Sequence, residues 1–300
     1  MMLQMKKMAI EAKKELELST LFPPPWETME ELKNVTDDWM NRWISKRSHI
    51  AQNHSQFAFF SDNIDKMVRT ELPEHTDNPE VSSGRKLKIV RNIHRTNLLL
   101  GVYRHYIKIL TPLIMEVAAI RNRPVRLLEL ASGSGEMAMN LARLASKNNL
   151  PVEVTGSDYV EAVVKDAEER AFERGLEMHF RTINAFDMDV LKQGEYDIIL
   201  ITGTMHHFTP GQLAVVIAQS RKFASSAFVG IDGYRSMSLL FLLPVVHLVT
   251  FSTDNIHDSW LTARKFYTLS ELEYIANIAV PDAKISATHS FPGVSVLIAS

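Results

Sequence analysis

The chain has 300 residues, of which 46% are hydrophobic and 23% are charged, as in an ordinary globular protein. Lys and Arg number 33 and Asp and Glu number 35, which leaves a formal net charge of −2. A chain so balanced lacks the basic surface expected of a nucleic-acid-binding protein. It contains no cysteine, which excludes disulfides, thiolate zinc sites, cysteine-held iron–sulfur clusters and cysteine nucleophiles.

The first twenty residues contain no targeting signal, because Lys and Glu interrupt the apolar residues and no small-residue cleavage site follows. The longest apolar run, residues 239–250, is too short to span a membrane and contains Pro244 and His247. We therefore expect a soluble, cytoplasmic protein without a membrane span. The apolar run is expected to be core or lid, and a weak membrane-surface contact is the lesser alternative.

Residues 1–123 predict an N-terminal helical cap region. Apolar residues recur at roughly helical spacing near its start, and the prolines from Pro23 to Pro25 end that first helix. The segment 71–85 is polar and contains Pro and Gly, which predicts a loop. Residues 86–120 then predict one long helix or two.

From Val125 the sequence changes to short apolar runs that alternate with amphipathic segments. This alternation predicts parallel strands joined by helical crossovers. The predicted strands are residues 125–130, 152–157, 177–183, 196–202 and 227–231. The predicted helices are residues 134–147, 160–174 and 210–223. Residues 124–300 are therefore expected to form one α/β core domain.

The C-terminal part of the chain adds an insertion and a hairpin to this pattern. The insertion covers about residues 233–266 and contains the apolar run. A helix is expected at residues 270–279, with Ser270 as its N-cap. Two further strands, residues 283–289 and 294–299, are joined by a turn so short that they must be antiparallel. The predicted sheet is thus mostly parallel, with one antiparallel strand at its end.

The glycine-rich segment after the first predicted strand is the main chemical signal in the sequence. Gly133 and Gly135 permit backbone torsions and a close ligand approach that a Cβ would prevent, beside the strand ends where α/β sheets bind ligands. The same residues also fit the G-x-G-x-x-A dinucleotide fingerprint. Glu129 favours a different ligand, because its carboxylate would repel a pyrophosphate and attract the ammonium and sulfonium groups of S-adenosylmethionine.

On these residues the sequence resembles the class I S-adenosylmethionine-dependent methyltransferases, over roughly residues 125–300. The segment ELASGSG is similar to the first motif of that family, which implies that Glu129, Ala131, Gly133 and Gly135 bind the cofactor. The resemblance also implies a Rossmann-like sheet of seven strands whose last strand is antiparallel. That arrangement agrees with the order of elements expected from the sequence pattern.

Later positions match other motifs of the family. The implied contacts are Asp158 with the ribose hydroxyls, Tyr159 with the adenine face, Asn184 and Ala185 with the adenine amino group, and Thr202 and Gly203 with the methionine portion. The family usually has Asp where this chain has Asn184, and Asp187 is a nearby substitute. Two alternatives remain at these positions, an N-cap role for Asp158 and a turn role for Asn184.

The segment MHHF at residues 205–208 resembles the Leu-His-His-Leu ending of a family motif. His206 or His207 is a candidate general base, because histidine titrates near neutral pH, and structural packing is the alternative for both. Adjacent histidines rarely share one metal ion, and no third ligand stands at metal-ligand spacing in the sequence. We therefore expect no metal site.

The sequence thus predicts an enzyme that transfers a methyl group from S-adenosyl-L-methionine to a small, lipophilic acceptor, on oxygen, carbon or nitrogen. The apolar insertion favours an apolar acceptor. The segment 202–205 lacks the Asn-Pro-Pro-aromatic motif of methyltransferases that act on nucleobase amines. Two alternatives stay open, namely an NAD(P)-dependent oxidoreductase that uses the same glycine segment and a non-catalytic homologue that binds the cofactor.

Overall fold

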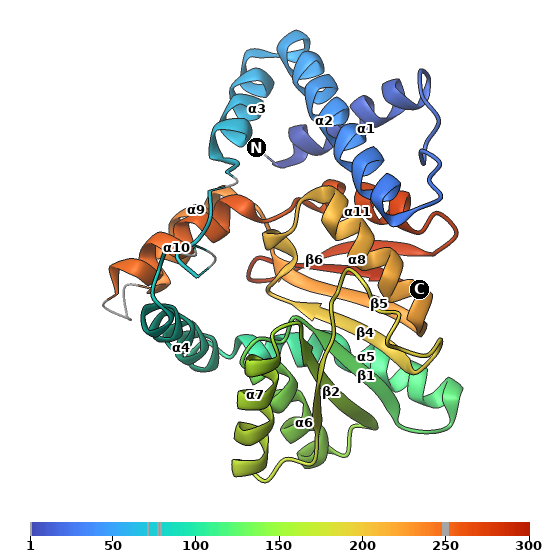
Figure 1. Cartoon of the computed structure of the whole chain (residues 1–300). Coiled ribbons are helices and arrows are strands. Elements are labelled where there is room, and N and C mark those ends of the chain that lie inside the picture. The colour runs from blue at the N-terminus through green and yellow to red at the C-terminus, as the bar shows by residue number, and fades with distance from the viewer. Residues whose placement is uncertain (1, 71, 77, 79, 248–251) are drawn as a thin grey trace.

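The computed structural model describes residues 2–70, 72–76, 78, 80–247 and 252–300. Its centre is a seven-stranded sheet of order β3-β2-β1-β4-β5-β7-β6 (Figure 1). The strands are β1 Val125–Leu130, β2 Val152–Asp158, β3 His179–Thr182, β4 Tyr196–Thr202, β5 Ala224–Gly233, β6 Ile285–Ser290 and β7 Val294–Ala299. Strands β1 to β5 are parallel, and β7 runs antiparallel to both β5 and β6. The predicted fold class is confirmed.

The central strands form where the sequence has short, mostly apolar runs. Strand β4 is buried along its length up to Thr202, as expected for a strand covered by helices on both faces of a sheet. The predicted bounds of β1 and β4 are confirmed to the residue. Strand β3 is shorter than the predicted strand 177–183, and β5 extends beyond the predicted strand 227–231 at both ends.

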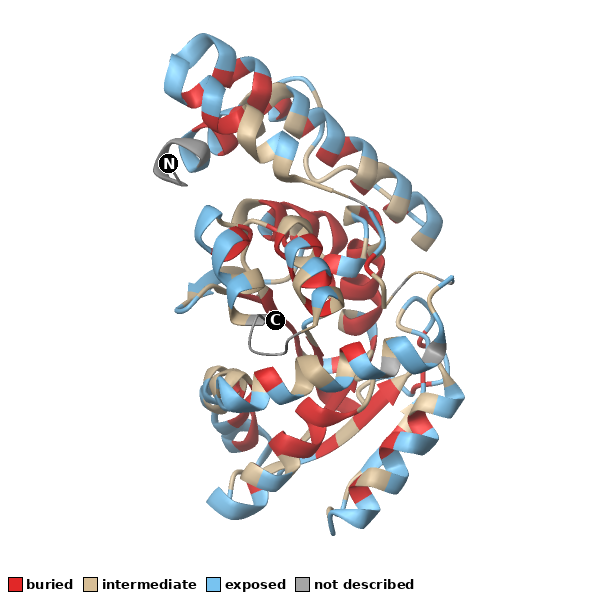
Figure 2. Cartoon of the chain, turned by 90° about the vertical axis from the view of Figure 1, so that its left-hand side faces the viewer, coloured by how far each residue is buried: buried red, intermediate tan, exposed pale blue. Residues whose placement is uncertain are grey.

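Helices cover both faces of the sheet. One face packs against α8 (Pro210–Phe223) and α11 (Leu269–Ala279), and the other packs against α5 (Val102–Arg121), α6 (Glu136–Asn148) and α7 (Glu161–Glu173). Figure 2 shows buried residues concentrated in the strands and in the helix faces that touch them. The expected N-cap at Ser270 is wrong. Thr268 caps α11 instead, because its side chain and that of Glu271 form a capping box.

The N-terminal helices are α1 (Met2–Glu17), α2 (Met29–His54) and α3 (Gln56–Val68), at the top of Figure 1. Helix α2 crosses α8 so closely that a Cβ at Gly211 would lie 2.2 Å from the carbonyl oxygen of Lys33. At this crossing the carboxylate of Asp37 accepts a hydrogen bond of 2.7 Å from the Gly211 backbone amide. The buried indole of Trp43 donates to the Ala9 carbonyl oxygen at 3.0 Å, which joins α2 to α1.

The segment expected to form one long helix or two forms two, α4 (Ser83–Leu99) and α5. Gly101 adopts φ 68°, in the left-handed region that glycine tolerates, and the two helices meet at a bend of 64°. In the described part of the chain no single helix is long and apolar enough to cross a membrane, and this bent pair meets that criterion only when its two helices are taken together.

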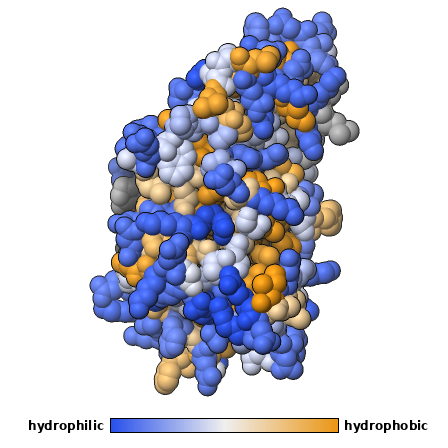
Figure 3. Space-filling model, turned by 90° about the vertical axis from the view of Figure 1, so that its right-hand side faces the viewer, coloured by the Kyte–Doolittle hydropathy of each residue, from blue (hydrophilic) through white to orange (hydrophobic). Residues whose placement is uncertain are grey.

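Helix α5 packs on the sheet itself, because Leu110, Ile114 and Val117 belong to the same buried cluster as Leu127 of β1. Helix α5 belongs to the predicted cap of residues 1–123 but packs on the predicted core of residues 124–300. The division between the two stays a prediction. Figure 3 shows that hydrophilic side chains cover most of the face on the right-hand side of the molecule, with separate hydrophobic groups between them.

The insertion after β5 forms two helices, α9 (Met237–His247) and α10 (Thr253–Lys265). Of the apolar run 239–250, residues 248–250 lie outside the described residues. Within α9, Leu239 and Leu240 are buried, whereas Phe241 and Val245 are exposed. Both helices lie beside α4 on the left of Figure 1, and an Asn92–Asn255 hydrogen bond of 3.0 Å joins α4 to α10.

Candidate active site

The glycine-rich turn leaves the sheet at the carboxyl end of β1. Ala131, Gly133 and Gly135 have φ of 48°, 52° and 72°, so three of five consecutive residues are left-handed. The Ser132 amide donates to the Ser157 carbonyl oxygen at 2.8 Å and thereby ties the turn to β2. A Cβ at Gly135 would lie 2.5 Å from the Phe180 ring, whereas a Cβ at Gly133 would meet nothing within 4 Å. The turn is therefore packed on one side and open on the other.

Glu129 is a buried carboxylate at the base of this turn. Its exposed fraction is 1%, and its Oε1 accepts a hydrogen bond of 2.6 Å from the Thr202 hydroxyl at the end of β4. Its Oε2 is buried and has no hydrogen-bond partner among the described residues. Burial raises the pKa of Glu129 to about 7, although the Thr202 hydroxyl and the Ala138 backbone amide oppose the rise. A cationic ligand at Oε2 would satisfy this atom and stabilise the charged form.

Asp158 joins the end of β2 to the glycine turn. Its Oδ2 accepts a hydrogen bond of 3.1 Å from the Gly133 amide, and its Oδ1 accepts one of 3.0 Å from the Val160 amide that precedes α7. The first bond places the carboxylate on the turn. The N-cap alternative for Asp158 is wrong, because the N-cap of α7 is Val160, which has no side-chain capping bond, and the Asp158 contact lies before the helix. Tyr159, next along the chain, is 75% exposed. The ribose and adenine roles of these two residues stay predictions.

Asn184, which follows β3, lies in a turn, as the alternative to its adenine-binding role predicts. The Asn184 side-chain oxygen accepts a hydrogen bond of 3.0 Å from the Phe186 amide, and its backbone oxygen accepts one of 3.0 Å from the Asp187 amide. The side chain of Asn184 is exposed and Ala185 is half-buried. A cofactor role for this pair stays a prediction.

The end of β4 supplies a second open position. Gly203 has φ 60°, and a Cβ placed on it would meet nothing within 4 Å. Its amide donates to the Ile231 carbonyl oxygen at 2.8 Å, which fixes it beside β5. The fold thus brings Glu129 and Thr202 into direct contact, with Gly203 next to Thr202 and Asp158 bonded to Gly133.

His206 is buried in a cluster of acidic side chains. Its Nδ1 lies 2.9 Å from Asp232 Oδ2 at the end of β5, and its backbone amide donates to the same carboxylate at 3.0 Å. Its Nε2 lies 3.7 Å from Glu74 Oε1. Although burial alone would lower it, the pKa of His206 is raised above its ordinary value by Asp232 and Glu74. His207 is exposed, and its ring lies 4.2 Å from that of His206.

The structure therefore adds two acidic residues that sequence reasoning missed. Asp232 carries a usable signal, since it ends an apolar strand as Asp158 does. Glu74 carries none, because it stands in a polar loop 132 residues before His206 and only the fold brings them together.

Helices α4 and α5 also reach the glycine turn. The Ser134 hydroxyl is bonded to His94 Nε2, and the other ring nitrogen of His94 lies 2.6 Å from the Tyr103 hydroxyl. Burial lowers the pKa of His94 to about 4, so its ring is neutral at pH 7. In the first turn of α6, Glu136 pairs with Arg170 of α7 and with Arg174, the residue that follows α7. These contacts hold the turn between its neighbouring helices.

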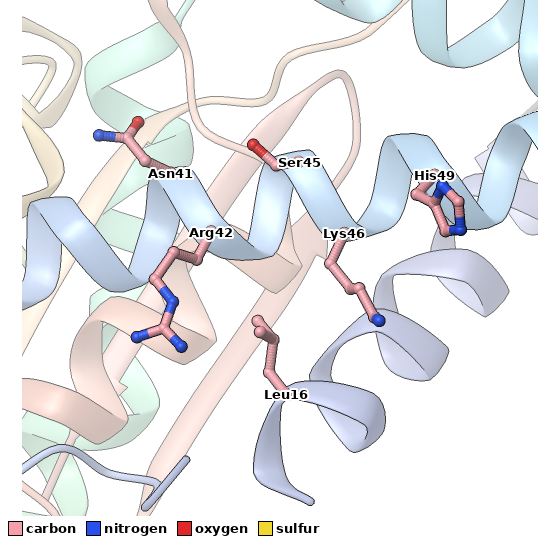
Figure 4. A pocket seen from close by; sticks show the side chains of 6 residues that line it. All are labelled: Leu16, Asn41, Arg42, Ser45, Lys46 and His49. Atoms are coloured by element: carbon pink, nitrogen blue, oxygen red, sulfur yellow. The ribbon is translucent and has the colours of Figure 1, made fainter. Parts of the chain in front are cut away.

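A surface hollow elsewhere on the molecule takes no residue from this site. It has a volume of about 470 Å³ and lies where α1 approaches α2 (Figure 4). Its lining consists of Leu16, Asn41, Arg42, Ser45, Lys46 and His49. These residues lie on the N-terminal helices, away from the strand ends that carry Glu129, Asp158 and Thr202.

Comparison with known proteins agrees with this location. Residues 127–225, from within β1 to the start of β5, match the family model of the methyltransferase domain. No curated protein matches the chain.

Among solved structures, the plantazolicin methyltransferase BamL in complex with a triazolic desmethylPZN analog and SAH aligns with a TM-score of 0.56 and 15% identity, over 72% of this chain and 91% of that one. The plantazolicin methyltransferase BpumL with SAH aligns with a TM-score of 0.55 and 16% identity, over 73% of this chain and 91% of that one. At such identities the likeness shows a shared fold.

The residues at the strand ends fit an adenosyl cofactor that carries an ammonium group. Oε2 of Glu129 is a buried acceptor without a partner in the described structure, and Gly133 and Gly203 leave open the space that a Cβ would fill. A dinucleotide would instead place its phosphates near the Glu129 carboxylate, which would repel them. The site therefore disfavours the oxidoreductase alternative. The family match and the sheet topology identify the chain as carrying a class I S-adenosylmethionine-dependent methyltransferase domain.

Proposed function

We propose that this methyltransferase acts on a small, largely apolar acceptor whose reactive atom carries a removable proton, and that His206 takes up that proton. The observation that carries the proposal is the His206–Asp232 pair at the carboxyl ends of β4 and β5. When bound, S-adenosylmethionine supplies a methyl group attached to a positively charged sulfur. The chain itself has to bind the cofactor, orient the acceptor and remove the proton.

The Asp232 carboxylate determines which nitrogen of His206 is the base. A carboxylate only accepts hydrogen bonds, so the contact of 2.9 Å to Nδ1 places a proton on that nitrogen and leaves the lone pair of the neutral ring on Nε2. The Asp232 charge also stabilises the imidazolium that forms when Nε2 takes a proton. The backbone bond from the His206 amide to the same carboxylate holds the pair in register.

Glu129 and Thr202 help to bind the cofactor and take no part in the proton transfer. Their hydrogen bond of 2.6 Å fixes Oε1, so the unpartnered Oε2 is held ready for the cofactor's ammonium group. Asp158 holds the amide of Gly133, which keeps the turn in its open conformation. Each of these contacts exists before ligand binding, so the site is preorganised.

The elements beside His206 favour an apolar acceptor. The Phe266 ring packs edge-on against His206 with centroids 5.2 Å apart. Helix α9 presents exposed Phe241 and Val245 next to α10. Apolar side chains with few convergent polar groups are typical of sites for small organic molecules. The plantazolicin methyltransferases were solved with small-molecule analogs or SAH, which supports the same class of acceptor.

The proposal is tested with labelled cofactor. The full chain is incubated with methyl-labelled S-adenosylmethionine and a panel of phenols, carboxylic acids, amines and peptides, and label transfer is measured from pH 5 to 9. We expect transfer to an apolar small molecule, with a rate that rises with pH as His206 loses its proton. Label confined to peptides would reject the acceptor class.

A matched pair of variants tests the base. His206→Asn is expected to lower kcat roughly 100-fold, the usual size of a general-base contribution, and to leave adenosylhomocysteine affinity unchanged. His179→Asn, on the exposed end of β3, is the control and should retain full activity. An unchanged kcat and pH profile in His206→Asn would show that His206 is not the base.

A further inference from the structure

A second histidine cluster lies close to the proposed base but outside the cofactor site. It consists of His75, from the loop between α3 and α4, and His257 and Asp258, from α10. His75 Nδ1 lies 2.7 Å from Asp258 Oδ1, and His257 Nδ1 lies 3.3 Å from the same oxygen. The two imidazole rings have centroids 4.4 Å apart. Two ring nitrogens thus converge on one carboxylate oxygen.

Asp258 has an unusual environment for a carboxylate. Its exposed fraction is 2%, and its Oδ2 is buried without a hydrogen-bond partner among the described residues. Its Oδ1, in contrast, also accepts a hydrogen bond of 3.0 Å from the His75 backbone amide. A buried carboxylate with one unsatisfied oxygen is costly unless a cation compensates it.

We propose that His75, His257 and Asp258 bind a divalent transition-metal ion of the zinc type. Bonds of about 2.0–2.1 Å in a tetrahedral site place neighbouring ligand atoms roughly 3.3 Å apart. The 3.3 Å between His257 Nδ1 and Asp258 Oδ1 has this value. The 2.7 Å between His75 Nδ1 and the same oxygen is a hydrogen-bond distance, so the ion replaces the shared proton and these atoms separate by roughly 0.6 Å.

The ligand types select the class of ion. Two imidazole nitrogens with one carboxylate suit zinc, nickel, cobalt or copper, whereas magnesium and calcium prefer oxygen ligands. His257 is half-exposed, with 51% of its side chain accessible, so an ion and a water ligand can reach the cluster from solvent.

The neighbouring trio of Glu74, His206 and His207 has ligand atoms at similar mutual distances but suits a metal ion less well. The ammonium of Lys265 lies 3.7 Å from Glu74 Oε1, and a divalent cation bound there would face this positive charge. The Arg85 guanidinium also acts on Asp258, but it is neutralised by its pair with Asp254, so the structure favours the His75 cluster as the metal site.

Binding at His75 would also affect the site described above. Glu74 precedes His75 directly, and its Oε1 lies 3.7 Å from His206 Nε2. An ion that joins His75 to α10 fixes the backbone next to Glu74 and so holds this carboxylate near His206. This consequence rests on the proposed function, whereas the binding of the ion does not.

The binding test needs no acceptor and is therefore independent of the proposed function. The full chain is freed of metal with a chelator and titrated with Zn²⁺ by calorimetry and with Co²⁺ by visible absorption. We expect one equivalent of each ion, with the intense absorption bands of tetrahedral cobalt. Absence of binding of both ions would overturn the proposal.

Variants locate the ion. His257→Ala removes a half-exposed side chain, so the fold should survive, and its circular-dichroism melt verifies this. We expect Zn²⁺ affinity to fall at least tenfold in His257→Ala and Asp258→Asn, and to stay unchanged in the control His179→Ala. Affinity lost in His206→Ala but retained in His257→Ala would assign the ion to the other trio and reject the proposed ligands.

Discussion

Arg235 and Glu271 form a buried ion pair in which the guanidinium Nη2 lies 2.8 Å from Oε1. Both side chains are at most 3% exposed. Arg235 also contacts Asp65 of α3 at 3.1 Å, and Glu271 accepts a hydrogen bond of 2.7 Å from Arg69. Asp65 in turn pairs with Arg47 of α2. This network links the N-terminal helices to α11 and to the segment that follows β5.

The first prediction concerns the stability of this network. Glu271→Gln leaves Arg235 buried with an incomplete partner, and breaking one side of a buried pair costs about 3–5 kcal/mol. We expect a loss of this size in the free energy of unfolding, measured with urea at pH 7. Glu161→Gln, in an exposed pair with Lys165, is the control and should leave the urea midpoint unchanged. A shift in Glu271→Gln no larger than in this control would contradict the assigned role.

The network also predicts how stability depends on pH. Burial alone would raise the pKa of Glu271, but Arg235 and Arg69 outweigh it and hold the pKa well below the ordinary 4.5. A lowered carboxylate pKa stabilises the fold above the unfolded pKa, and this stability is lost as the pH falls toward the folded pKa. We expect the melting temperature to drop below about pH 4.5, and to drop less steeply in Glu271→Gln. An equal fall of the melting temperature with pH in both proteins would show that Glu271 does not cause this dependence.

Cofactor binding should depend on the protonation of Glu129. Its pKa is raised to about 7 by burial, and the ammonium of the cofactor requires the carboxylate form. We therefore expect adenosylhomocysteine affinity to fall as the pH falls below 7, as measured by calorimetry between pH 5.5 and 8.5. Glu129→Gln should weaken binding about 10- to 100-fold, since hydrogen bonds to charged groups contribute roughly 1.5–3 kcal/mol, and should abolish this pH dependence. Unaltered affinity in Glu129→Gln would remove Glu129 from the binding site.

The two glycines of the turn should respond differently to the same substitution. Both have positive φ, which costs an alanine about 1–2 kcal/mol, but only at Gly135 does the new Cβ meet the Phe180 ring. We expect Gly135→Ala to destabilise the fold roughly 1–3 kcal/mol more than Gly133→Ala. Gly133→Ala should instead weaken adenosylhomocysteine binding, because its methyl group occupies open space at the turn. Urea unfolding measures the loss of stability, and calorimetry measures the loss of binding. A larger loss of stability in Gly133→Ala, with a larger loss of binding in Gly135→Ala, would show that the ligand does not approach the turn at Gly133.

Asp158 can be tested for ribose binding apart from its hydrogen bonds to the Gly133 and Val160 amides. Loss of such a bond lowers stability by about 1 kcal/mol without changing which ligand is preferred. If the carboxylate binds the ribose, the wild-type chain should bind adenosylhomocysteine at least tenfold more tightly than its 2′-deoxy analog, and Asp158→Ala should bind the two alike. The same preference in both proteins would assign Asp158 only to the backbone hydrogen bonds that it accepts.

The strands of the core and the turn after β1 could be predicted from the sequence, because local sequence pattern determines where they form. Strands β1 and β4 are mostly apolar, and Gly135 has a left-handed conformation that favours glycine, so both strands and the turn could be predicted from the local sequence. The sequence pattern predicts the N-cap of α11 two residues late, because Ser270 and Thr268 are both good caps and only the reciprocal bond with Glu271 decides between them.

The acidic partners of His206 could not be predicted in the same way. Glu74 and Asp232 approach it only when the loop after α3 folds over the ends of β4 and β5. The expectation of no metal site likewise considered neighbours in sequence, whereas His75 and His257 are 182 residues apart. Long-range convergence of this kind depends on how α10 packs, which no local spacing encodes.

The hydrogen bond from the Gly211 amide to Asp37 bears on how this enzyme can be shortened. Because α2 packs against α8 and its Asp37 accepts a hydrogen bond from the Gly211 amide, a fragment starting at β1 would lose this acceptor and expose the apolar side of α8 to water. Grafting the methyl-transfer unit alone into a fusion protein should therefore yield insoluble material, and workable chimeras must take the N-terminal helices along.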